Sequence, residues 1–211
     1  MKKKPILLLG AGGHARACID VIEQNGFYEV AGLVGLAEEA GTNILGYSVI
    51  GVDNNIPELL KEFTNVLIAI GQIKTHVQRE RLFNTVMQNG GNLQSVISPS
   101  AYVSKHAKIG DGTIVMHGAI VNAGASVGKN CILNSQSLIE HDSVIADHCH
   151  IATSATINSG VTISSGTFIG SNCSVRQRTN IGEHCVIGMG QNVLSDCAAG
   201  TWLPKRLKIK K

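Results

Sequence analysis

A histidine between two carboxylates is the arrangement in this chain best suited to chemistry. Glu140, His141 and Asp142 are consecutive, and His148 and His150 follow closely. Flanking carboxylates stabilise an imidazolium, and a histidine in that setting suits a base that takes up a proton near neutral pH. The sequence therefore makes His141 a candidate general base.

Zinc binding is the competing use of histidine. Three imidazoles that converge on an open site would hold a catalytic zinc ion. The available histidines are His117, His141, His148, His150 and His184. The carboxylates beside His141 have no place in that design, and no Cys-x-x-Cys pair occurs. We therefore expect no metal.

A second arrangement lies near the start of the chain. Residues 10–15 read Gly-Ala-Gly-Gly-His-Ala, after an apolar run at 5–9 and before a predicted helix over 15–25. Glycines in such a turn let the backbone approach a phosphate, and the helix start offers free N–H groups. A tight turn without a ligand is the alternative. A dinucleotide site also needs an acid at the end of the second strand. Here Val34 and Gly35 end that strand, and Glu38 and Glu39 come later, so a single nucleotide diphosphate is favoured over NAD.

A six-residue period must position the histidines. From Ile97 to Val193 every sixth residue is Ile, Leu or Val, and only Gln191 breaks the preference for a small residue four positions later. This pattern is typical of a hexapeptide parallel β-helix, a three-sided prism with about eighteen residues per coil. Residues 97–198 then form five to six coils. His141 falls on a corner and is directed outward.

The same period predicts the assembly and the use of cysteine. His141 and His150 are half a coil apart and so lie on different sides of one prism. Their cooperation would need a second copy, and we expect a homotrimer with three equivalent clefts. Five of the six cysteines fill the small position of the repeat, as reduced apolar fillers: Cys131, Cys149, Cys173, Cys185 and Cys197.

The first part of the chain has another pattern. Apolar runs at 5–9, 30–34 and 66–70 alternate with predicted helices over 15–25, 57–63 and 74–88. Strands without alternation, separated by helices, indicate a small parallel sheet covered on both faces. We predict a Rossmann-like α/β domain over residues 1–90, followed by a β-helix domain over 91–211.

Composition limits the function classes. The chain has 211 residues and a net charge of +3, much of it in lysines at the two ends. No run approaches the ~20 apolar residues of a membrane helix, and no signal peptide is evident. We expect a cytoplasmic protein with no membrane span and no nucleic-acid partner.

Three motifs together resemble one family. They are Gly-Ala-Gly-Gly-His-Ala-Arg at 10–16, Ile-Ala-Ile-Gly at 68–71, and the stretch from Leu133 to Val144 followed by His-Cys-His-Ile-Ala at 148–152. Essentially the whole chain resembles the NeuD/PglD-type sugar acyltransferases of bacterial nucleotide-sugar and sialic-acid pathways. The resemblance implies a left-handed β-helix and a homotrimer that binds acetyl-CoA along the prism, between subunits. It also implies N-acetylation of the 4-amino group of a nucleotide-linked, UDP-type 4-amino-4,6-dideoxy sugar.

The resemblance also implies roles for residues. His141 would be the base, Asp142 would orient it, and Asn134 would lie nearby. His150 would contact the acetyl end of CoA, and the Ser159 N–H would be the oxyanion donor. Two further sets are implied: CoA-lining Ser171 and Met189, and nucleotide-sugar-binding Gly12, Gly13, His14 and Gly71.

The chain departs from the family at two places. Val34-Gly35 stands where an acidic pair is usual, and residues 200–205 replace the usual Gly-x-Pro-Ala-Lys ending. O-acetylation of a sialic-acid-like sugar and a non-catalytic nucleotide-sugar-binding trimer remain the alternative functions. Direct transfer is expected in either enzymatic case, because the register buries the cysteines that an acyl-enzyme would need.

Overall fold

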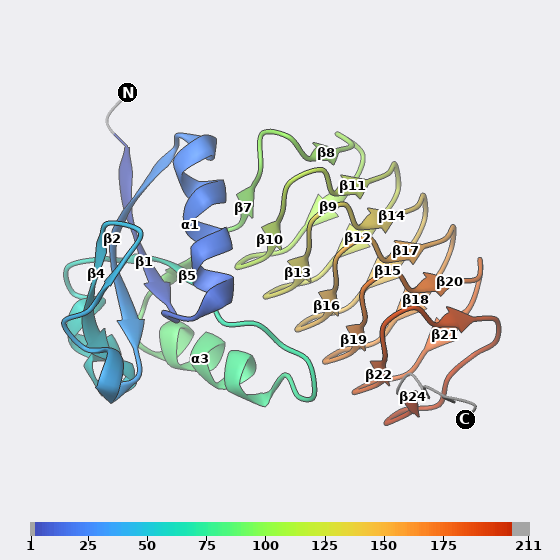
Figure 1. The fold of residues 1–211 in the computed structure, drawn as a ribbon. Coiled ribbons are helices and arrows are strands. Elements are labelled where there is room, and N and C mark those ends of the chain that lie inside the picture. Colours follow the sequence, from blue (N-terminus) through green and yellow to red (C-terminus); the bar gives the residue numbers. More distant parts are fainter. Residues whose placement is uncertain (1–2, 204–211) are drawn as a thin grey trace, which may run out of the picture.

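The computed structural model describes residues 3–203 as an α/β unit followed by a three-sided prism of short strands (Figure 1). Residues 1–2 and 204–211 lie outside the described residues. Most of the two lysine-rich ends and the last part of the altered 200–205 motif therefore fall outside the described part of the chain.

The α/β unit is built on a six-stranded sheet with the order β3-β4-β2-β1-β5-β6. Its strands are β1 (Lys4–Leu9), β2 (Tyr28–Gly35), β3 (Asn43–Ile44), β4 (Tyr47–Val52), β5 (Asn65–Ile68) and β6 (Asn92–Leu93). All neighbours are parallel except β3 and β4. The predicted parallel sheet is confirmed, whereas the β3–β4 hairpin was not foreseen. Its turn places Leu45 at a φ of 50°, and leucine is not a residue that signals such a turn.

Helices cover both faces of this sheet. They are α1 (Gly13–Asn25), α2 (Ile56–Leu59) and α3 (Val77–Gln88), with 3-10 helices η1 (Ala37–Glu39) and η2 (Asp53–Asn55). Helix α1 packs on one face in a core shared with the prism, while α2 and α3 pack on the other. The helix predicted over 57–63 is shorter than expected: α2 begins at Ile56, has Pro57 in its first turn and ends at Leu59. The helix predicted over 74–88 begins only at Val77.

The prism has three faces of two-residue parallel strands (Figure 1). The first face holds β7 (Val96–Ile97), β10 (Ile114–Val115), β13 (Ile132–Leu133), β16 (His150–Ile151), β19 (Phe168–Ile169), β22 (Val186–Ile187) and β24 (Trp202–Leu203). The second holds β8 (Tyr102–Val103), β11 (Ile120–Val121), β14 (Leu138–Ile139), β17 (Thr156–Ile157), β20 (Ser174–Val175) and β23 (Asn192–Val193). The third holds β9 (Lys108–Ile109), β12 (Ser126–Val127), β15 (Val144–Ile145), β18 (Thr162–Ile163) and β21 (Asn180–Ile181).

The hexapeptide register is confirmed. Strands pair with the residue one coil on, as Leu133 does with Ile151, and the second residue of each pair points into the prism. Four of the five predicted cysteine fillers are fully buried there, and Cys197 is half-buried. The corners turn through a left-handed residue, such as Asn130, Asp142 or Gly160, so small polar residues and glycines are frequent at them. The fold is an α/β domain followed by a left-handed parallel β-helix.

The first face of the prism carries the α/β unit. Ile114 and Ile132 are fully buried and belong to the same core as Ile19 and Ile22 of α1. Removing this apolar surface from water favours docking by about 25 cal/mol per Å². The packing fixes one corner and one face of the prism, those that carry Asn134 and His150, against the α/β unit.

Candidate active site

The His141 corner, residues 140–142, follows β14 on the edge between the second and third faces. Asp142 has a φ of 61°, which turns the chain and brings its carboxylate back beside the imidazole. His141 Nδ1 donates to Asp142 Oδ2 at 2.8 Å. The hydrogen bond assigns the proton to Nδ1 and leaves Nε2 free to accept one. More than half of the His141 side chain is exposed, so a substrate amine has access to it.

Glycine one coil below makes room for this carboxylate. A Cβ at Gly124 would lie against Asp142 Oδ1, closer than two such atoms approach. Within residues 3–203, Glu140 Oε2 accepts only from the His141 backbone N–H, at 3.2 Å. The two carboxylates predicted to assist His141 therefore have different roles, because Asp142 holds the ring and Glu140 holds the backbone.

A hollow of about 370 Å³ opens beside this corner. It is lined by His141, Asp142, Ser159, Gly160, Gln177 and Arg178, which come from three successive coils. The Gly160 N–H is already engaged by the His141 carbonyl at 3.1 Å. Within residues 3–203 the Ser159 N–H has no acceptor, so of these two amides it is the one available to a developing oxyanion.

His150 occupies a different part of the molecule. It lies on β16 with 7 % of its surface exposed, and its ring meets Phe168 edge to face. Its Nδ1 lies 2.6 Å from the Gln72 carbonyl oxygen, and its Nε2 lies 3.4 Å from Asn134 Nδ2. Burial lowers the pKa of His150 to about 4, so this histidine is neutral at pH 7.

The structure brings Asn134 to His150, not to His141. Asn134 lies on the corner after β13, where its Oδ1 accepts from the Ser135 N–H at 2.8 Å. His141 lies on the next corner along the chain. Within one protomer the predicted site residues therefore form two separate groups, one around His141 and one around His150.

The glycine turn and His14 lie on the same side of the α/β unit as His150. Added Cβ atoms at Gly12 and Gly13 would meet nothing within 4 Å, so the turn is open to a ligand at the start of α1. Gly71, after β5, approaches His14, since its added Cβ would lie 3.9 Å from the Cβ of His14. Burial, with the charges of Arg79 and His150, lowers the pKa of His14 to about 3.

A buried arginine joins the two units. Arg79 of α3 is 1 % exposed and donates to the carbonyls of Ile68 and Ile70, and to Asn130 O and Oδ1 on the prism, at 2.6–3.1 Å. Burial lowers its pKa to about 10, so it stays charged at pH 7. Sequence reasoning missed it, although Arg79 shares the apolar stripe of its helix with Leu82, Phe83 and Val86, which is an unusual place for a charge.

Both parts of this architecture match known families. Residues 5–86 match the PglD N-terminal domain, and residues 106–141 match the bacterial transferase hexapeptide (six repeats). The chain is a sugar acyltransferase of the NeuD/PglD type. A search among curated proteins finds no match.

Several solved structures are similar to this sugar acyltransferase over nearly its whole length. PerB from Caulobacter crescentus, in complex with CoA and GDP-perosamine, is 29 % identical, with a TM-score of 0.87 over 93 % of this chain and 92 % of that one. The acetyltransferase domain of PglB from Neisseria gonorrhoeae, in complex with acetyl coenzyme A, is 26 % identical, with a TM-score of 0.87 over 95 % and 96 %. WeeI from Acinetobacter baumannii shares the fold at 22 % identity, with a TM-score of 0.85 over 96 % and 97 %.

The two CoA-lining residues expected in this acyltransferase share one column of the prism. Met189 follows Ser171 by one coil, and the Gly190 N–H donates to the Ser171 carbonyl at 2.8 Å. Met189 is well exposed. This column continues the corner that carries Asn134, and so belongs with the His150 group within one protomer.

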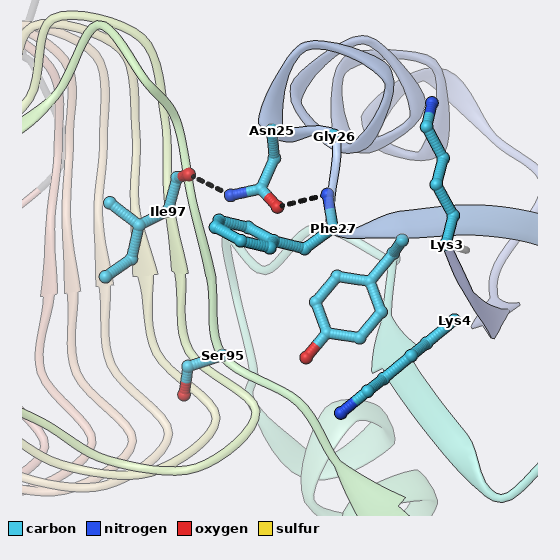
Figure 2. Close-up of a pocket in the computed structure, with 8 residues that line it drawn as sticks. Lys3, Lys4, Asn25, Gly26, Phe27, Ser95 and Ile97 are labelled. Carbon is cyan, nitrogen blue, oxygen red and sulfur yellow. Dashed lines mark hydrogen bonds between the residues drawn. The ribbon is translucent and has the colours of Figure 1, made fainter. Parts of the chain in front are cut away.

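A hollow of about 600 Å³ lies away from all of these residues (Figure 2). Its lining includes Lys3, Lys4, Phe27 and Ser95, at the opposite end of the sheet from the glycine turn. None of the predicted site residues contributes to it. Within residues 3–203 no cluster of three or more histidine, cysteine or carboxylate side chains is arranged to hold a metal ion, and no helix there is long and apolar enough to cross a membrane.

Proposed function

We propose that this protein transfers the acetyl group of acetyl-CoA to the 4-amino group of a nucleotide-linked 4-amino-4,6-dideoxy sugar. The observation that carries the proposal is the His141–Asp142 hydrogen bond of 2.8 Å on an exposed corner of the prism. The similar PerB and PglB structures, which hold CoA with GDP-perosamine and acetyl coenzyme A, support the same reaction class.

The chemistry is direct transfer. The amine nitrogen attacks the thioester carbon while His141 Nε2 takes the amine proton. Asp142 holds the ring and stabilises the imidazolium that forms. The Ser159 N–H donates to the oxyanion of the tetrahedral intermediate. Collapse of the intermediate breaks the C–S bond, and the CoA thiolate takes up the proton from the His141 imidazolium as it leaves.

The complete site is proposed to lie between two subunits of a homotrimer. His141 and the His150 group are on different sides of one prism, so a neighbouring prism would bring the second group to the first. Asn134 and His150 would then face the acetyl end of CoA. The column of Ser171 and Met189 would line the rest of that molecule.

The α/β unit, residues 1–90, is proposed to hold the nucleotide sugar, with residues 91–211 carrying the transfer. The open turn at Gly12 and Gly13 would take the diphosphate at the start of α1, and His14 and Gly71 would border the sugar. The family resemblance implies a UDP-linked sugar, whereas the PerB structure holds a GDP-linked one. A cytoplasmic location follows as a prediction from these soluble substrates.

Two other functions share the same fold. An O-acetyltransferase of a sialic-acid-like sugar would use His141 to activate a hydroxyl instead of an amine. A non-catalytic trimer would bind nucleotide sugar without turnover. The exposed and oriented imidazole of His141 favours an enzyme over the binding protein, because binding alone does not need such a base.

The test is release of free thiol from acetyl-CoA with a panel of acceptors. The panel contains UDP- and GDP-linked 4-amino sugars, their 4-hydroxy counterparts, and sialic acids. Thiol release with a 4-amino sugar and an amide product supports the proposal. Release only with hydroxyl acceptors replaces it with O-acetylation. No release with any acceptor, together with measurable nucleotide-sugar binding, replaces it with the binding protein.

A further inference from the structure

The carboxylate of Glu39 lies at the edge of the sheet where a nucleoside would bind. Glu39 ends η1, the 3-10 helix that follows β2, and its side chain folds back toward the last residue of that strand, Gly35. A Cβ added at Gly35 would lie 2.8 Å from Glu39 Oε2 and 3.0 Å from the Cβ of Ala11, which is in the glycine turn. The carboxylate and the turn therefore both border the position where Gly35 has no side chain.

Gly35 is what permits this arrangement. Its φ is not in the left-handed region, so the backbone does not need glycine there. Any other residue would place a Cβ within 3.0 Å of both Ala11 and Val49 and against the Glu39 carboxylate. The space that a side chain would take at the end of β2 is thus occupied by a carboxylate that comes from four residues later.

One oxygen of this carboxylate remains available to a ligand. Oε2 accepts from the Leu36 N–H at 2.8 Å, which fixes the side chain over the strand end. Oε1 accepts no hydrogen bond from residues 3–203. The neighbouring Glu38 is exposed and makes no such contact.

In parallel α/β sheets, ligands bind outside the carboxyl ends of the strands, and an acid at the end of the second strand accepts hydrogen bonds from the nucleoside. The diphosphate would lie at the start of α1, next to Ala11. We propose that Glu39 recognises the nucleoside of the nucleotide sugar by accepting a hydrogen bond from a ribose hydroxyl or a base N–H. This inference rests on the proposed function, because it assumes the same nucleotide site.

Glu39→Gln is the informative substitution. A glutamine oxygen still accepts from the Leu36 N–H, but its amide NH₂ then faces the ligand. Two hydrogen-bond donors, this NH₂ and the hydroxyl or N–H of the nucleoside, would then face each other. Loss of a hydrogen bond to a charged group predicts affinity for GDP and UDP roughly 10- to 100-fold weaker, measured by calorimetry. Glu38→Gln removes the same charge from the adjacent exposed residue, and its affinity should stay within about twofold.

A second variant tests the geometry. In Gly35→Ala the new methyl group displaces the Glu39 carboxylate, and nucleotide affinity should fall as in Glu39→Gln. The double variant should be no weaker than Glu39→Gln, because both changes remove the same interaction. Additive losses would contradict this part of the inference. If Gly35→Ala fails to fold, the comparison of Glu39→Gln with Glu38→Gln decides alone.

A comparison of different nucleotides identifies the group of the nucleoside that Glu39 recognises. Loss with GDP but not with 2′-deoxy-GDP assigns the contact to the ribose 2′-hydroxyl. Loss with GDP but not with UDP assigns it to the guanine base, and both outcomes support the proposal. Wild-type affinity for every nucleotide in Glu39→Gln overturns the inference and leaves the proposed function intact. A wild-type protein that binds none of these nucleotides overturns both.

Discussion

His150 Nδ1 donates a hydrogen bond of 2.6 Å to the backbone carbonyl of Gln72, and so ties the prism to the loop that follows β5. A carbonyl only accepts, so the proton is on Nδ1 and the lone pair of Nε2 faces Asn134 Nδ2 at 3.4 Å. The Asn134 amide is oriented from both ends, since its oxygen accepts from the Ser135 N–H. Docking of the α/β unit thus fixes the orientation of the His150 ring, and with it the polar pair of His150 and Asn134 at the proposed acetyl site.

The pH dependence of stability follows from this neutral histidine. The unfolded chain binds a proton at His150 below about pH 6.5, whereas the folded protein binds it only near pH 4. The contribution of neutral His150 to the free energy of unfolding is therefore fully present above pH 6.5. It falls as the pH drops toward 4, by about 1.4 kcal/mol for each pH unit per histidine. His14, with a folded pKa of about 3, acts in the same direction.

Thermal unfolding of the wild type and of His150→Gln from pH 7.5 to 4 measures this effect. The variant should lose part of the decline in melting temperature at low pH. His106→Gln, at an exposed corner, should keep the wild-type curve. Parallel curves for His150→Gln and the wild type would contradict the linkage.

Arg79 is expected to be essential for joining the two units. In Arg79→Met the carbonyls of Ile68 and Ile70 and the amide of Asn130 lose their donor within a buried region. The expected loss in unfolding free energy is on the order of 3–5 kcal/mol, measured by urea denaturation. Arg81→Met breaks surface contacts only, the pair with Asp53 and the hydrogen bond from Nε to Gln78 Oε1, and should cost within about 1 kcal/mol. Equal losses in the two variants would contradict the role given to Arg79.

Period and register explain why so much of the prism could be predicted. A six-residue repeat fixes which side chain points inward, so the outward corner position of His141 and the buried cysteines followed directly. The sheet of the α/β unit followed from apolar runs such as 66–70. Strand β6, at Asn92–Leu93, was missed because two residues carry no periodic signal.

Contacts between distant segments could not be read from the chain. The hydrogen bond between Gln72 and His150 depends on how the α/β unit packs on the first face of the prism. The return of Glu39 to Gly35 depends on the short helix between them. The lack of an acid at the end of β2 is visible in the sequence, but a local pattern does not reveal where a side chain four residues later points.

Asp142 is predicted to orient His141. Asp142→Asn removes the charge that stabilises the imidazolium, and kcat for acetyl transfer should fall about 10- to 100-fold. Glu140→Gln is the matched control, because within residues 3–203 the Glu140 side chain hydrogen-bonds only to the backbone of His141, and its kcat should stay within about threefold. A larger loss in Glu140→Gln than in Asp142→Asn would reverse the two roles.

A site shared between subunits predicts complementation. His141→Ala and Asn134→Ala should each be inactive as pure trimers. Co-assembled in equal amounts, they should recover roughly a quarter of wild-type activity, because some interfaces combine an intact His141 with an intact Asn134 from the neighbour. Mixtures as inactive as the pure variants would place both residues in a single-protomer site or remove Asn134 from the reaction.

The most direct test of the central claim is the turnover of His141→Ala against the wild type, with acetyl-CoA and the 4-amino sugar nucleotide that the wild type accepts. Calorimetry first establishes that the variant still binds both substrates. The account predicts an amide product from the wild type and a kcat lower by roughly 10²- to 10⁴-fold in the variant, with trimer assembly unchanged. Wild-type turnover in His141→Ala would contradict the assignment of the base and, with it, the proposed mechanism.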